Sequence, residues 1–353
     1  MKIKALTVGV PPHVFHVPTT SHAMWIVSAC LLVPILQSAG TDGFRSLIIA
    51  AITVGTALGM EFFLCAGSDT RSYTDGSAVA SALILCLILP NNINLFMPFI
   101  GTIFGIVVVK KSFGGLGSNW INPAAGAWLF LRFSWPETFD TALKGSALSM
   151  LSSSVSKGMS DPGGSPLALL KVSGWKPGNV DAIITSWLND TILIPLGAEL
   201  PGAYTDFMHS SLPALIIDRG VLGFLLISVL LLSSGIVRWI LPFVYLVFYI
   251  VAVRIWGALP YGGQLFGGDM LFSLLSGSTL LGAFIFAGNP ATGTKTRTGT
   301  VILAAFAGFL AYWFRFRGGD AYGLIPSITV VNVLAIIARR IEHRSLYSLG
   351  RKR

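Results

Sequence analysis

Two turns in this chain combine glycine, asparagine and proline in a way that suits a ligand site. In each, an apolar run leads into the sequence Asn-Pro-Ala, at residues 122–124 and again at 289–291. Glycine lets the backbone approach a ligand closely, and the N–H groups at the start of a helix favour an anion. The candidate binding residues are Gly114, Gly115, Gly117, Asn122, Asn289 and Thr292. A tight turn that only packs two helices is the alternative, and the second copy of the motif favours the ligand.

Two acidic residues lie inside apolar runs, where they could carry an ion. Glu61 falls within the second run, and Asp218 is followed by Arg219 in a later one. An isolated charge at the centre of a membrane helix costs about 3 kcal/mol on insertion scales, so such residues are paired or face a cavity. Glu61 and Asp218 are therefore candidates for an ion path. An ion pair that holds helices together is the other interpretation.

Other kinds of chemistry lack the residues that they need. Cys30, Cys65 and Cys86 lie in three different apolar runs without a Cys-x-x-Cys spacing, so this chain alone cannot build a four-thiolate iron–sulfur site. The sequence has no Ser-His-Asp arrangement and no phosphate-binding loop of the nucleotide-hydrolysing type. We therefore predict no catalytic residue, no nucleotide-driven pump and no metal site.

The composition requires a membrane. Of the 353 residues, 53% are hydrophobic and only 11% are charged, and the mean hydropathy is +0.74. A soluble globule of this composition would expose large apolar patches, whereas a bilayer accepts them. The predicted spans are residues 23–38, 45–66, 78–90, 95–109, 124–133, 212–232, 236–255, 270–287, 300–314 and 323–338.

We predict an all-α polytopic membrane protein with about ten transmembrane helices in two pseudo-symmetric halves with glycine-rich turns. Several spans are short, and short segments at matching positions of two halves indicate a site near the bilayer midplane. One long polar insert should lie on the outer face as loops and short surface helices. The predicted divisions are an N-terminal segment (1–22), the first half (23–133), the insert (134–211), the second half (212–338) and a basic tail (339–353).

The positive charges indicate the orientation, because Lys and Arg beside membrane helices stay on the cytoplasmic side. We therefore predict that both termini are cytoplasmic and that Arg315 and Arg317 are exceptions on the outer side. The net charge of +9 then indicates contact with anionic lipid head groups. Because the cations are scattered at span ends, we predict no nucleic-acid partner. The cytoplasmic cations are Lys2, Lys4, Arg71, Lys110, Lys111, Arg238, Lys295, Arg297, Arg339, Arg340, Arg344, Arg351, Lys352 and Arg353.

Three stretches together resemble the NqrB/RnfD family over nearly the whole chain. They are Pro12-His13 with Thr20, Met24 and Pro34, the block 110–117 with Asn122-Pro123-Ala124, and 281–284 with Asn289-Pro290-Ala291-Thr292. The length suits the D subunit of the Rnf complex better than the longer B subunit of the sodium-pumping NADH:quinone oxidoreductase. The resemblance implies a flavin-carrying subunit of the bacterial cytoplasmic (inner) membrane that couples electron transfer between ferredoxin and NAD to Na⁺ or H⁺ movement. It also implies other membrane and peripheral subunits of an Rnf-type complex as partners.

The same resemblance implies a covalent cofactor. In this family, FMN is attached through its phosphate to a hydroxyl residue in an outer loop, and the matching stretch here is Gly163-Gly164-Ser165-Pro166-Leu167. Ser165 stands where threonine is usual and Gly164 where alanine is usual, yet serine offers the same nucleophilic oxygen. Ser165 is therefore the expected FMN attachment residue. A second flavin such as riboflavin is expected near the glycine-rich turns.

Two other functions fit parts of the sequence. A structural subunit of the same complex would keep the fold without covalent flavin. Paired Asn-Pro-Ala turns also occur in channels whose half-helices meet at the bilayer midplane, so a channel or small-solute transporter is the second alternative.

Overall fold

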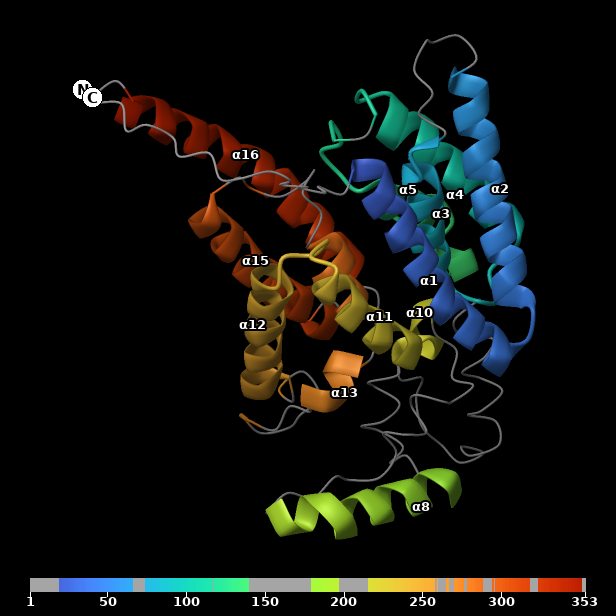
Figure 1. Ribbon diagram of the computed structural model, residues 1–353, viewed down its shortest axis with the longest axis vertical. Helices are drawn as coiled ribbons and strands as arrows, with labels where there is room; N and C mark the ends of the chain where they lie inside the picture. Colours follow the sequence, from blue (N-terminus) through green and yellow to red (C-terminus); the bar gives the residue numbers. More distant parts are fainter. Residues whose placement is uncertain are drawn as a thin grey trace, which may run out of the picture.

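The computed structural model describes residues 19–65, 74–115, 117–139, 179–196, 215–257, 259, 265–266, 270–275, 278–287, 294, 296–317 and 323–350. Over these ranges the protein is helical, and extended pairing is confined to one isolated bridge between Pro90 and Leu215. The described helices fall into two groups that lie side by side, with the first group at the right of Figure 1 and most of the second at the left.

The first helix group contains five consecutive segments of the chain. They are α1 (Thr20–Asp42), α2 (Arg45–Cys65), α3 (Ser77–Ile88), α4 (Phe96–Phe104) continued by the π-helix η2 (Gly105–Lys111), and α5 (Pro123–Ser134). The α3 helix lies at the centre of this group, and eleven of its twelve residues are buried because α1, α2, α4 and α5 all contact it.

The second helix group follows the insert. It comprises α10 (Ile216–Arg219), α11 (Val221–Ser233), α12 (Ile240–Trp256), α13 (Met270–Leu275), α14 (Thr279–Leu281) with the π-helix η6 (Gly282–Phe286), α15 (Arg297–Tyr312) with the π-helix η7 (Trp313–Arg317), and α16 (Leu324–Gly350). The α12 and α15 helices pack along each other, and α16 packs on α15.

Within the described residues, each predicted span falls mainly on helical structure, which confirms an all-α polytopic chain. Four helices are long and apolar enough to cross a bilayer, at Thr20–Gly40, Arg45–Cys65, Arg297–Phe316 and Leu324–Arg344. Three shorter apolar helices are Ser77–Ile88, Val221–Ser233 and Ile240–Trp256. Large side chains such as Phe62, Phe133 and Leu226 are exposed on the outside of these helices, where lipid tails or apolar partner surfaces are the expected environment.

The two groups meet through α1 with α10 and α11, and through α5 with α16. Gly220 and Gly223 lie against Pro34 in α1, and a Cβ at Gly220 would come within 2.5 Å of the Pro34 side chain. The backbone N–H of Gly223 donates to Gln37 Oε1 at 2.5 Å. Small residues allow this close helix approach in the same way as in other membrane bundles.

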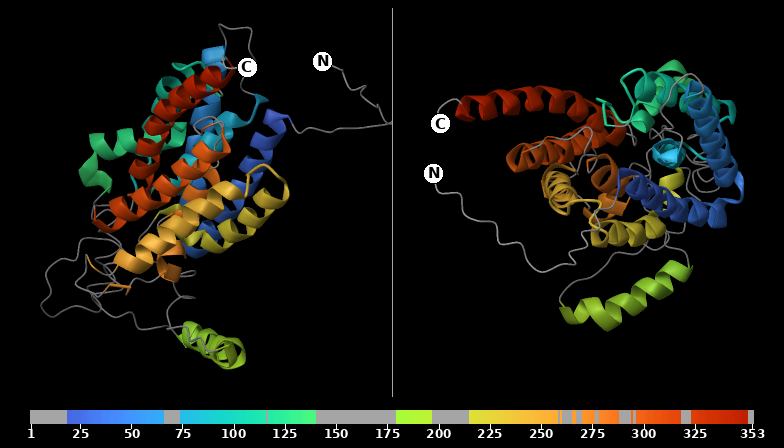
Figure 2. Two further views of the ribbon diagram at one scale, coloured as in Figure 1. Left: turned by 90° about the vertical axis from the view of Figure 1, so that its left-hand side faces the viewer. Right: turned by 45° about the horizontal axis from the view of Figure 1, so that its top comes forward.

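One helical segment lies apart from the bundle. The α8 helix (Asn179–Leu188) continues through the π-helix η3 (Asn189–Leu193) and the 3-10 helix η4 (Ile194–Leu196), and it runs across one end of the bundle in Figures 1 and 2. It exposes Ile183, Trp187 and Ile194. A short helix was expected in this insert, and α8 lies within it; its position on the membrane surface stays a prediction.

Candidate functional site

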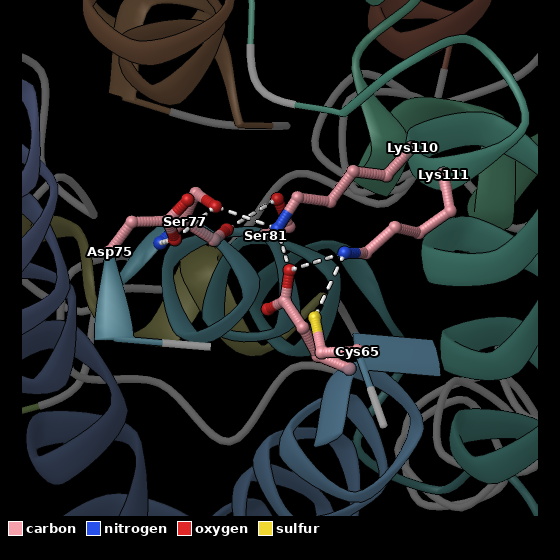
Figure 3. Close-up of polar contacts among 7 residues, drawn as sticks. Cys65, Asp75, Ser77, Ser81, Lys110 and Lys111 are labelled. Atoms are coloured by element: carbon pink, nitrogen blue, oxygen red, sulfur yellow. Dashed lines mark hydrogen bonds and ion pairs between the residues drawn. The ribbon is translucent and has the colours of Figure 1, made fainter. Parts of the chain in front are cut away.

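The first helix group contains an ion pair in its interior. Lys110 of η2 and Glu61 of α2 lie 2.8 Å apart, measured from Nζ to Oε1, and their side chains are 2% and 0% exposed. Figure 3 shows Lys110 pointing toward Ser77 at the start of α3. Two opposite charges withdrawn from solvent must compensate each other, because a single buried charge is expensive.

A hydroxyl group extends the ion pair to a second carboxylate. Lys110 Nζ donates to Ser77 Oγ at 2.6 Å, and that hydroxyl donates to Asp75 Oδ1 at 2.6 Å. The same carboxylate oxygen accepts the backbone N–H of Ser77 at 2.8 Å. Between them, Gly76 adopts φ 75°, which glycine tolerates without a Cβ penalty. A continuous polar chain therefore runs from Glu61 through Lys110 and Ser77 to Asp75.

Lys111 lies at the edge of this polar chain. Its Nζ is 3.8 Å from Glu61 Oε1, and its side chain is 22% exposed. It also donates to Cys65 Sγ at 3.3 Å. Glu61 thus lies near two ammonium groups, Lys110 and Lys111, and a second carboxylate, Asp75, is connected to Lys110 through the Ser77 hydroxyl (Figure 3). The formal charges balance, and the arrangement can exchange a proton between an ammonium group and a carboxylate.

The glycine-rich turn fixes the end of η2 that carries both lysines. The N–H of Gly114 donates to the Lys111 carbonyl at 3.1 Å, and the N–H of Gly115 donates to the Lys110 carbonyl at 3.0 Å. Gly114, Gly115 and Gly117 have φ values of 99°, 86° and 90°. We expected glycine N–H groups that are free for a ligand, and for Gly114 and Gly115 this was wrong, because orphan carbonyls at a helix end take such donors first.

The asparagines after the glycines also have local partners. Asn119, with its amide nitrogen facing two carbonyls, donates to Gly115 O at 3.1 Å and to Lys110 O at 3.2 Å. Asn122 Oδ1 accepts the N–H of Ala124 at 3.0 Å and caps α5, with Pro123 in the first turn. Asparagine before proline is a standard helix start. These contacts favour the tight-turn interpretation for the first Asn-Pro-Ala motif.

Asp218 is buried in the second helix group. Its Oδ2 accepts the N–H of Leu215 at 3.3 Å, and its Oδ1 accepts the N–H of Ser278 at 3.1 Å. The carboxylate therefore joins the start of α10 to the start of α14. Arg219 beside it is also buried.

Arg315 is a further buried cation, and the sequence interpretation missed its role. Its predicted position on the outer side of the membrane stays a prediction, but the burial of its side chain was not foreseen, since only 6% of the residue is exposed. Its Nη1 donates to Tyr249 Oη at 2.6 Å, to Ser273 O at 2.8 Å and to Thr279 Oγ1 at 2.9 Å. The available signal was its position inside the aromatic run 313–317, since an arginine within a membrane segment faces the protein interior.

Lys110 was likewise interpreted as a cytoplasmic cation next to lipid head groups. Its burial rules out the contact with head groups, while its cytoplasmic side stays a prediction, and its pairing with Glu61 was not foreseen. The other predicted binding residues, Gly163, Gly164, Ser165, Asn289 and Thr292, lie outside the described residues. The structure thus places Glu61 next to the glycine-rich turn and Asp218 in the other helix group.

Comparison with known proteins matches residues 7–347 to the NQR2, RnfD, RnfE family. One relative, the D subunit of the Na(+)-translocating ferredoxin:NAD(+) oxidoreductase complex of Acetobacterium woodii, is 30% identical over 98% of this chain and 96% of its own length. The D subunit of the proton-translocating ferredoxin:NAD(+) oxidoreductase complex of Clostridium ljungdahlii is 27% identical over 95% of this chain and 93% of its own length. The D subunit of the ion-translocating oxidoreductase complex of Pectobacterium atrosepticum is 28% identical over 88% of this chain and 89% of its own length. The chain belongs to the NQR2, RnfD, RnfE family.

Proposed function

We propose that this chain is the D subunit of an Rnf-type complex, which couples electron transfer between ferredoxin and NAD to the movement of Na⁺ or H⁺ across a bacterial cytoplasmic membrane. Similarity to the D subunits of such complexes over nearly the full length supports the assignment. The observation that carries the ion-moving part is the buried Glu61–Lys110 pair inside an apolar helix bundle. An ionisable residue at such a place marks an ion or proton path by default.

Glu61 is the carboxylate that we assign to the ion path. Its partner is a lysine side chain, which can move or change its protonation state, and Lys111 leads from the pair toward the surface. Both oxygens of Asp218 instead accept backbone N–H groups at two helix starts. Those contacts suit a structural carboxylate, so Glu61 is the stronger of the two candidates.

The ion path has a direct test in the whole complex. The assembled complex is reconstituted in vesicles, and ion uptake is measured with Na⁺ and with H⁺ indicators during ferredoxin-driven NAD reduction. Both ions are needed because two relatives of nearly equal identity carry names with different ions. Glu61→Gln should abolish uptake, and Asp218→Asn serves as the matched control. Full uptake by Glu61→Gln would remove Glu61 from the path.

The proposed flavin attachment rests on the sequence alone. Ser165 lies in Gly163-Gly164-Ser165-Pro166-Leu167, where its hydroxyl would form the phosphoester to FMN. Bound flavin supplies one-electron transfer, and the contribution of this chain is to hold and orient it. The N–H groups of Gly114 and Gly115 already donate to the carbonyls of Lys111 and Lys110, so these two groups do not serve as donors to a second flavin.

Flavin fluorescence in a denaturing gel tests the attachment. The subunit is produced in cells that contain the flavin transferase, and wild type is compared with Ser165→Ala, Ser165→Thr and the neighbouring control Ser160→Ala. Fluorescence in wild type, Ser165→Thr and Ser160→Ala, with a dark Ser165→Ala band, would support the phosphoester. A dark wild-type band would favour a structural subunit without covalent flavin.

The location and partners follow from the same assignment. We propose that both termini lie in the cytoplasm and that other membrane and peripheral subunits cover part of the exposed apolar surface. Single cysteines introduced at Ser21 and at Ser348, in a variant whose three native cysteines are replaced, should react with a membrane-impermeant thiol reagent only in inside-out vesicles. Labelling in right-side-out vesicles would reverse the orientation.

A further inference from the structure

Several contacts within one helix group have a counterpart in the other. In the first, α2 contacts α4 and α4 contacts α5; in the second, α12 contacts α15 and α15 contacts α16. The first helices of the groups, α1 and α11, contact each other, and so do the last helices, α5 and α16. A two-fold relation between the groups requires contacts of this kind, because the elements nearest the axis meet their own counterparts. We use the correspondence α1 with α11, α2 with α12, α3 with α14, α4/η2 with α15/η7, and α5 with α16.

The two Asn-Pro-Ala motifs do not coincide under this correspondence. The first directly precedes α5, the last helix of its group. The second lies between η6 and α15, so that both α15 and α16 follow it. The two Asn-Pro-Ala motifs therefore occupy different positions in the two helix groups. Evidence that the groups are related must come from another feature.

Buried cations do coincide. Each group has a residue with positive φ at the start of its central short helix, Gly76 at 75° and Ser278 at 59°. The next residue carries a hydroxyl, Ser77 or Thr279, and each hydroxyl accepts from a buried cation. The distances are 2.6 Å for Lys110 and 2.9 Å for Arg315. Both cations lie in π-helical segments: Lys110 in η2, which continues α4, and Arg315 in η7, which continues α15.

Each cation also contacts the second helix of its group. Lys110 binds Glu61 of α2 at 2.8 Å, and Arg315 binds the Tyr249 hydroxyl of α12 at 2.6 Å. The two sites thus share four features: a left-handed residue, a hydroxyl at a helix start, a cation in a π-helix, and a polar side chain from the second helix. They differ in chemistry. One joins an ammonium to a carboxylate, and the other joins a guanidinium to a phenol.

We propose that Lys110 and Arg315 are equivalent positions of an internal repeat, and that only the Lys110 site exchanges protons during ion movement while Arg315 is a fixed clamp. This inference rests on the proposed ion-translocating function. A buried lysine can release its proton, whereas a guanidinium stays charged in proteins. A carboxylate can accept that proton, whereas the phenol of Tyr249 cannot serve as a base in its neutral form.

The exchange is a balanced proton transfer. The proton on Lys110 Nζ moves along the 2.8 Å contact to Glu61 Oε1, so an N–H bond breaks and an O–H bond forms. The products are a neutral amine and a neutral carboxylic acid, and no electron is gained or lost. Among the described residues, the other ionisable groups near Lys110 are Lys111 with the Cys65 thiol and, through Ser77, Asp75. A cation that approaches Glu61 would favour the reverse transfer, because it restores the carboxylate as a ligand.

Reciprocal substitutions test the proposal in the reconstituted complex. Lys110→Arg keeps the charge but replaces an ammonium group, which can deprotonate, by a guanidinium, which cannot, and Arg315→Lys makes the opposite change. The quantity measured is ion uptake per electron transferred. We expect Lys110→Arg to lose uptake as Glu61→Gln does, and Arg315→Lys to keep the wild-type ratio. Full uptake by Lys110→Arg, or equal loss in both variants, would overturn the proposal.

An infrared measurement separates a proton-carrying role from a structural one. Redox-difference spectra should contain the C=O band of a protonated carboxyl group in wild type and in Arg315→Lys. The band should be absent in Glu61→Gln and in Lys110→Arg. If Lys110→Arg does not assemble, a wild-type spectrum that lacks a band sensitive to Glu61→Gln overturns the proposal by itself. If Glu61→Gln itself retains ion uptake, Glu61 is not on the ion path. That result would contradict the proposed function, whereas a failure of Lys110→Arg alone to lose uptake would contradict only the proton exchange.

Discussion

Lys110 Nζ lies 2.8 Å from Glu61 Oε1, and at most 2% of either side chain is exposed. Removing one partner leaves the other charge buried, so Glu61→Met or Lys110→Met alone should lower the free energy of unfolding by about 3–5 kcal/mol. The double variant Glu61→Met/Lys110→Met should lie close to wild type, since neither charge remains. Denaturant unfolding in mixed micelles measures all four proteins. A double variant as unstable as the sum of the singles would contradict a direct pair.

The positive φ of Gly115 should make this position intolerant of a side chain. Its φ is 86°, and a Cβ there would meet nothing within 4 Å, so only backbone strain opposes alanine. Gly115→Ala should cost about 1–2 kcal/mol of unfolding free energy. Gly55, within α2, also has open space around its Cβ position but lies in a helix interior. Gly55→Ala should therefore raise the unfolding free energy by roughly 0.5–1 kcal/mol. If both variants changed the unfolding free energy in the same direction, this account would be refuted.

Close packing between α12 and α15 should depend on Gly308. A Cβ at this position would collide with the backbone carbonyl of Tyr245. Gly308→Ala should force the helices apart and lower the unfolding free energy by about 1–3 kcal/mol. Gly59→Ala in α2, where a Cβ has open space, is the control. Thermal unfolding in detergent micelles compares them, and equal midpoints would show that α15 shifts without cost.

The Tyr249 hydroxyl should matter more than an ordinary tyrosine hydroxyl. It accepts from Arg315 Nη1 at 2.6 Å and donates to Ser273 O at 3.2 Å. Tyr249→Phe removes a partner of a buried cation and should cost about 1.5–3 kcal/mol. The Tyr312 hydroxyl donates to an uncharged acceptor, Trp256 O, at 3.2 Å, so Tyr312→Phe should cost about 1 kcal/mol. The two unfolding free energies, measured side by side, decide this; a larger loss for Tyr312→Phe would count against the Arg315 contact.

The membrane helices could be predicted from the sequence because apolar runs of bilayer length are a one-dimensional signal. The cap formed by Asn122 before Pro123 could also be predicted, since both residues act locally. The partners of Lys110 and Arg315 could not, because a cation at the end of an apolar run looks the same whether it faces lipid head groups or the protein interior. Only the arrangement of α2 and α3 places Glu61 and Ser77 within reach of Lys110.

The glycine-rich turn shows a similar limit. Positive φ at Gly114, Gly115 and Gly117 fits the expectation that this stretch needs glycine. The sequence alone could not show that the carbonyls of Lys110 and Lys111 would take the N–H groups of Gly115 and Gly114. The cation site around Arg315 could not be predicted either, because its partners Tyr249, Ser273 and Thr279 come from separate segments of the chain.

The described contacts between the two helix groups are those of α1 with α10 and α11, of α3 with α10 and of α5 with α16, together with the bridge between Pro90 and Leu215. The hydrogen bond from Gly223 N to Gln37 Oε1 also joins the two groups. None of these contacts needs a continuous peptide chain between the groups. Two separately translated polypeptides, 1–139 and 179–353, should therefore find each other in the same membrane and reassemble, with Gly220 and Pro34 serving as an intermolecular docking point.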